Sequence, residues 1–69
     1  MPGDPLDEEA ARERMRRLAA AGDHAGAISA YVALEHRLRA ELSVAPSRPT
    51  QRLLEEVRRG APPPLGTGR

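Results

Sequence analysis

The side chains that could do chemistry in this sequence are few, and they form no recognisable metal-binding pattern. His24 and His36 are twelve residues apart, and neither has a second histidine or a carboxylate three or four residues away. The spacing that places two metal ligands on one face of a helix is therefore missing. We expect both histidines to face solvent, and we predict no metal site and no cofactor.

Hydroxyl side chains act as nucleophiles only when a base lies beside them. Ser47 and Thr50 lie where a helix is expected to begin, and the chain has no Gly-x-Ser-x-Gly elbow and no phosphate-binding glycine loop. Cysteine is absent, which excludes disulfides, thiol catalysis and Cys-ligated zinc. We therefore predict no catalytic residue and no enzyme.

Arginine is the side chain that could contact phosphate groups, although the net charge of the chain is only +1. One group alternates with glutamates around more than one helical face, which is typical of a solvated surface: Arg12, Arg14, Arg16 and Arg17. A second group could reach DNA if the last two helices formed a helix-turn-helix: Arg48, Arg52, Arg58 and Arg59. The connection between those helices is longer than usual and holds two prolines, so DNA binding is the alternative interpretation.

The first element expected to position these side chains is a helix that starts near residue 4. Asp4 can cap it, and Pro5 suits its first position. Met15 and Leu18 give it an apolar stripe, and Gly22 is expected to end it.

The second predicted helix runs from Asp23 or His24 to Leu42. Its apolar residues follow spacings of four, three, four and four: Ala27, Tyr31, Leu34, Leu38 and Leu42. Small residues beside one aromatic are typical of closely packed antiparallel helices. The first two helices are therefore predicted to form a hairpin.

A third, short helix is predicted from Ser47, its cap, to Gly60, because Pro46 and Pro49 prevent the second helix from continuing. Its apolar edge consists of three residues: Leu53, Leu54 and Val57. Residues 60–69 are rich in proline and glycine and are predicted to be a flexible tail. The fold class is all-α, with a single module over residues 4–59.

The hairpin resembles the second half of a tetratricopeptide repeat, on the basis of Gly22-Asp23, Ala27-Ile28 and Tyr31. Further residues are similar to the end of the bacterial transcriptional activator domain of SARP-class antibiotic-pathway regulators: Tyr31, Leu34, Leu38, Glu41-Leu42, Val44, Pro46-Ser47, Thr50, Leu53 and Val57. This resemblance implies a helical-repeat fold and protein association within a transcription regulator.

The sequence departs from that family at the exit of the second helix and in extent. Ser43 stands where the family generally has glycine, and Arg48-Pro49 follow Ser47 in place of a proline and an acid. One hairpin does not bury its own face, since about three repeats are normally needed for stability. The chain could therefore also be a remnant of a larger regulator.

A second copy of the chain is the simplest way to cover the apolar length of the second helix. The predicted interface, with arginines as its polar rim, consists of Tyr31, Leu34, Leu38, Leu42, Leu53, Leu54 and Val57. No signal peptide and no apolar stretch of about eighteen residues is present, so we expect a cytoplasmic protein without membrane contact. The predicted function is a self-associating interaction module linked to transcription regulation.

Overall fold

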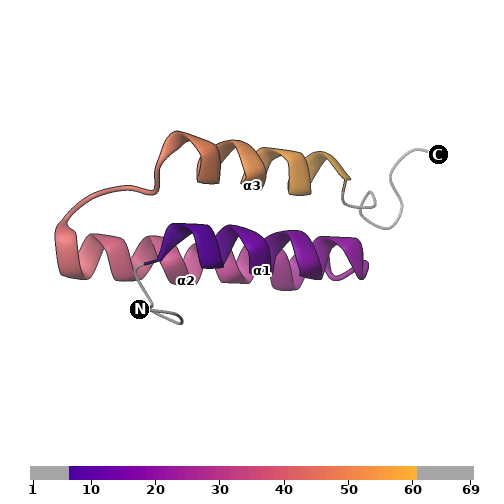
Figure 1. Cartoon of the computed structure of the whole chain (residues 1–69), viewed down its shortest axis with the longest axis horizontal. Coiled ribbons are helices and arrows are strands. Elements are labelled where there is room, and N and C mark those ends of the chain that lie inside the picture. Colours follow the sequence, from indigo (N-terminus) through magenta and orange to yellow (C-terminus); the bar gives the residue numbers. More distant parts are fainter. Residues whose placement is uncertain (1–6, 61–69) are drawn as a thin grey trace, which may run out of the picture.

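The computed structural model of the chain describes residues 7–60, which form three α-helices and no β-strand. α1 spans Glu8–Ala20, α2 spans His24–Leu42 and α3 spans Arg48–Gly60 (Figure 1). The predicted all-α fold, a helical hairpin plus a third short helix, is confirmed. Of the predicted flexible tail over residues 60–69, Gly60 is the last residue of α3, and residues 61–69 lie outside the described residues.

α1 begins later than the sequence predicted. Asp7 has the non-helical backbone angles φ −79° and ψ 102°, and its carboxylate accepts hydrogen bonds from the amides of Glu9 (3.0 Å) and Ala10 (3.3 Å). A side chain in this position satisfies amides that the first turn of a helix leaves free. Asp7 is therefore the cap of α1, whereas Asp4 and Pro5 lie outside the described residues.

The turn between α1 and α2 is tight and closes both helices. Gly22 has a left-handed φ of 87°, and its amide donates to the carbonyl of Ala19 at 3.0 Å. The amide of Asp23 donates to the carbonyl of Leu18 at 2.8 Å, which completes the usual glycine-based helix ending. The carboxylate of Asp23 then accepts the amide of Gly26 at 2.8 Å and starts α2. The helices consequently run antiparallel (Figure 1).

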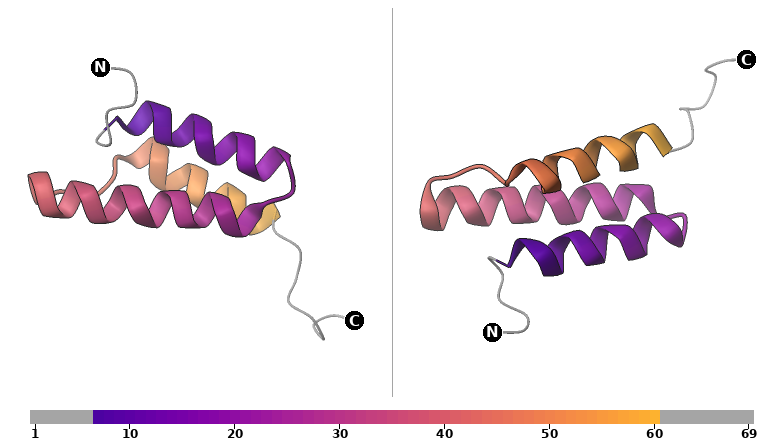
Figure 2. Two further views of the ribbon diagram at one scale, coloured as in Figure 1. Left: turned by 90° about the horizontal axis from the view of Figure 1, so that it is seen from below. Right: turned by 45° about the horizontal axis from the view of Figure 1, so that its top comes forward.

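α3 packs against both helices of the hairpin and lies along one side of it (Figure 2). The core cluster draws on all three helices: Met15, Ala27, Tyr31, Leu53 and Val57. Leu34 and Leu38 are buried farther along α2, so four of the five residues in its predicted stripe are buried. The helical spacing of three and four thus identified the packed faces correctly.

Leu42, the last residue of that predicted stripe, is 55% exposed. The C-terminal end of α2 extends beyond the first turns of α1 and α3, as both views show (Figures 1 and 2). The periodicity of a helix predicts which face is apolar, but it does not reveal where the neighbouring helices stop.

Residues 43–47 connect α2 to α3. Ser43 has a left-handed φ of 57°, although it is not glycine, and the buried Pro46 follows three residues later. The carbonyl of Pro46 accepts a hydrogen bond from Nε2 of Gln51 at 2.6 Å. Pro46 therefore lies between α2 and α3, whereas Pro49 lies in the first turn of α3.

Candidate functional site

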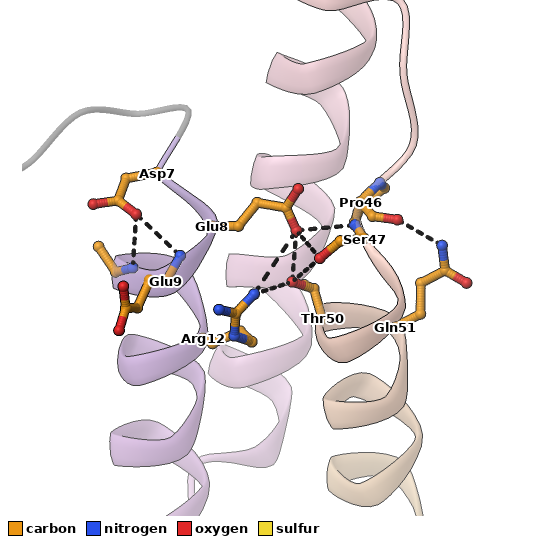
Figure 3. Close-up of polar contacts among 9 residues, drawn as sticks. Asp7, Glu8, Glu9, Arg12, Pro46, Ser47, Thr50 and Gln51 are labelled. Carbon is orange, nitrogen blue, oxygen red and sulfur yellow. Dashed lines mark hydrogen bonds and ion pairs between the residues drawn. The ribbon is translucent and has the colours of Figure 1, made fainter.

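A polar cluster joins the start of α1 to the start of α3 (Figure 3). Oε1 of Glu8 accepts hydrogen bonds from the amide of Ser47 (2.9 Å), from its hydroxyl (2.8 Å) and from the hydroxyl of Thr50 (2.6 Å). Nη1 of Arg12 donates to Oγ1 of Thr50 at 2.8 Å and lies 4.0 Å from Oε1 of Glu8. We call these four residues the Glu8 cluster.

Opposing influences act on the pKa of the Glu8 carboxyl group. Burial raises the pKa, but the hydrogen bonds from Thr50 and Ser47 and the charge of Arg12 together outweigh it, so the pKa is below its usual value of 4.5. The hydrogen bonds that lower this pKa are also the ones that join α1 to the start of α3.

Ser47 and Thr50 do more than the sequence predicted for them. Ser47 precedes α3 and its carbonyl accepts the amide of Gln51 at 3.0 Å, as expected of a cap residue, but its hydroxyl donates to Glu8 of α1. Thr50 is fully buried, and its hydroxyl both donates to Glu8 and accepts from Arg12. A buried hydroxyl with both partners present fixes the position of α3 on the hairpin.

Sequence reasoning placed Arg12 on a solvated face, and it missed the cluster. Glu8 and Thr50 are 42 residues apart, so no local pattern connects them. One signal was present: Thr50 precedes Leu53 and Val57 at spacings of three and four, which places it on the buried stripe of α3. A threonine on such a stripe needs a polar partner.

The two histidines lie in different surroundings. His36 is exposed, as predicted, whereas His24 is half-buried and its Nδ1 is buried without a hydrogen-bond partner between residues 7 and 60. Nε2 of His24 faces the end of α3, since a Cβ placed on Gly60 would lie 3.7 Å from it. In the described part of the chain, no group of three or more histidine, cysteine or acidic side chains is placed to hold a metal ion.

Most residues of the predicted interface lie in the core of a single chain. Five are buried there: Tyr31, Leu34, Leu38, Leu53 and Val57. Leu54 is partly buried against the core, and Leu42 is exposed. Burial raises the pKa of the Tyr31 hydroxyl, helped by the negative charges of Glu35 and Glu8, so this side chain stays neutral. A second chain that covers these residues stays a prediction.

The exposed large apolar side chains of residues 7–60 all lie on α2 or directly after it. Val32 is 42% exposed, Leu42 55% and Val44 47%. A shallow hollow on the outer surface of α2 surrounds Val32, and its lining is Ile28, Ser29, Val32, Ala33, His36 and Arg37. α2 therefore presents apolar groups away from the core as well as toward it.

The arginines predicted to contact nucleic acid are all exposed on α3: Arg48, Arg52, Arg58 and Arg59. Glu55 and Glu56 are exposed on the same helix, so α3 carries both signs of charge. The predicted nucleic-acid contact stays a prediction.

A bilayer-spanning helix is not found between residues 7 and 60, because none of the three helices combines the required length with the required apolar content.

The family model of the bacterial transcriptional activator domain matches residues 2–58. Comparisons with curated proteins and with solved structures find no match. The matched family is one of regulatory domains and not of enzymes, and it relates the chain to transcription regulation. Since the match spans most of the sequence, the chain belongs to the bacterial transcriptional activator domain family.

Proposed function

We propose that this chain is a protein–protein interaction module that self-associates and serves a cytoplasmic transcription regulator without catalysing a reaction. The observation that carries the proposal is the distribution of exposed apolar side chains. Val32, Leu42 and Val44 all belong to α2 or follow it, whereas α1 and α3 direct their large apolar residues toward the core.

A helix that is apolar on more than one face is usually buried on more than one face. α2 contributes Tyr31 and three further residues to the interior, yet Val32 and Leu42 remain in contact with water. Covering these side chains with a second chain removes apolar surface from water, which is the main driving force of association. A small module with one core also gains stability from association, since binding of a partner favours the folded state.

The test is the molar mass of the full chain, measured by sedimentation equilibrium or light scattering from roughly 1 μM to 1 mM. We expect the mass to rise toward that of a dimer with concentration. Leu42→Arg places a charge on the exposed end of α2 and is expected to weaken association about tenfold or more. Ala20→Arg is the matched control, since Ala20 is the exposed last residue of α1. A constant monomer mass over the whole range would contradict self-association.

A further inference from the structure

We infer that two copies of this chain associate by exchanging α3, so that each hairpin of α1 and α2 holds the third helix of the other copy. This inference rests on the proposed self-association and names the surface that carries it. The segment that binds each hairpin is α3 of the other copy, because α3 of the same chain already packs at this place (Figure 2).

α3 meets the hairpin through a single face. Thr50 is fully buried, Val57 is 4% exposed and Leu53 is 9% exposed, whereas the charged residues of α3 are all exposed. α3 therefore packs on the hairpin through its apolar face, in the way that an amphipathic helix binds in a groove. The same contacts form whether α3 comes from the same chain or from another.

The Glu8 cluster gives this docking its specificity. Glu8 and Arg12 belong to the hairpin, Ser47 directly precedes α3, and Thr50 lies in the first turn of α3 (Figure 3). Every hydrogen bond between Glu8 or Arg12 and these two residues crosses from the hairpin to the exchanged segment. Exchange consequently transfers these polar contacts together with the apolar ones.

The connection between α2 and α3 has the properties of a hinge that favours exchange. It is short, covering residues 43–47, and Ser43 holds a left-handed φ of 57° that side chains rarely adopt. A short connection under strain favours domain swapping, because an opened hinge releases the strain. Pro46 and Pro49 prevent α2 and α3 from merging into one continuous helix, so the opened hinge stays extended.

Exposed apolar side chains flank the strained residue. Leu42 is 55% exposed on one side of Ser43, and Val44 is 47% exposed on the other. In an exchanged dimer the two opened hinges run beside each other, since both chains cross between the same two hairpins. The four side chains from the two copies then cover one another, which is a contact that the single chain lacks.

A pair of engineered cysteines tests the exchange directly. The chain has no cysteine, and position 60 on α3 lies next to position 24 on the hairpin. The full chain carrying His24→Cys and Gly60→Cys is treated with a short thiol cross-linker at a concentration where light scattering shows dimers. We expect covalent dimers on a denaturing gel, with each single-cysteine variant as the control for random links.

The hinge provides a second measurement. Ser43→Gly removes the strain of the closed form and is expected to raise the dimer dissociation constant roughly fivefold, because each dimer contains two hinges. Ser43→Ala keeps a Cβ at this position and is expected to leave the constant unchanged. Dimers whose cross-links stay within one chain would overturn the exchange and leave self-association standing. A monomer mass at every concentration would overturn self-association, and the exchange with it.

Discussion

The two connections between helices in this molecule are stabilised in different ways. Both must end one helix, reverse the chain and begin the next, but the turn after α1 uses only its own residues. Gly22 supplies the left-handed backbone, and Asp23 both closes α1 and caps α2. The hydrogen bonds of this turn all join residues within a few positions of one another.

The connection after α2 depends on a distant helix. Ser43 adopts the left-handed conformation without the freedom of glycine, and the amide of Val44 reaches back to the carbonyl of Leu38 at 3.4 Å. The start of α3 is completed by Glu8, which accepts the amide and the hydroxyl of Ser47 from the first turn of α1. The difference indicates that the turn between α1 and α2 is closed by local residues alone, whereas the attachment of α3 depends on α1.

The largest effect that tests this difference is expected from Glu8→Ala. The change removes three hydrogen bonds to a charged acceptor and leaves Arg12 without its carboxylate partner. We expect a loss of about 2–3 kcal/mol in the free energy of unfolding, measured by urea denaturation. Glu9→Ala is the matched control, since Glu9 is the exposed neighbour in the same turn. Equal losses for both variants would mean that the cluster adds nothing beyond the helix dipole.

The dependence of stability on pH provides a second test of the contribution of Glu8. The pKa of Glu8 in the folded chain is below its usual value of 4.5, so the unfolded chain binds the proton first as the pH falls. The stability contributed by Glu8 is complete above pH 4.5 and disappears as the pH falls through the lower folded pKa. Unfolding free energies of the wild type and Glu8→Gln should therefore converge in acid. A constant difference between pH 7 and pH 3 would contradict this origin.

Gly22→Ala is expected to have the next largest effect, at the self-contained turn. No atom lies within 4 Å of the added Cβ, so the cost comes only from the left-handed φ of 87°. We expect a loss of about 1 kcal/mol in unfolding free energy. Far-ultraviolet circular dichroism should show that helicity is otherwise retained. Retention of full stability would show that the backbone of this turn relaxes freely.

Ser43→Gly is the reverse change and has the smallest expected effect. Glycine relieves the left-handed strain at φ 57°, but it also adds freedom to the unfolded chain. The balance is expected to be a gain of about 0.5 kcal/mol, seen in the thermal unfolding midpoint of dilute protein. A loss of stability would indicate that the Ser43 side chain contributes a contact of its own.

Local features of the sequence predicted most of the fold. Apolar residues at helical spacing located the three helices, and Gly22, Pro46 and Gly60 located the breaks between and after them. The start of α1 was placed too early, because Asp4 and Asp7 are both acceptable caps and only the packing of the helix selects one. The exposure of Leu42 was also unpredictable, since it depends on where α1 and α3 begin.

Some features of the candidate site could likewise be predicted from the sequence, and others could not. The exposed arginines of α3 follow from their residue type, and the buried stripe of α2 follows from periodicity. The Glu8 cluster does not, because the residues that meet in it come from opposite ends of the chain. Thr50 alone gave a hint, as a polar residue in phase with Leu53 and Val57.

The sequence by itself determined that this chain is a hairpin followed by a third helix, because caps, breakers and helical periodicity act over a few residues. Only the tertiary structure decided that Glu8 completes the start of α3, that Tyr31 lies in the interior of one chain and that Leu42 remains exposed. These outcomes depend on how different helices pack against one another, which no local pattern encodes.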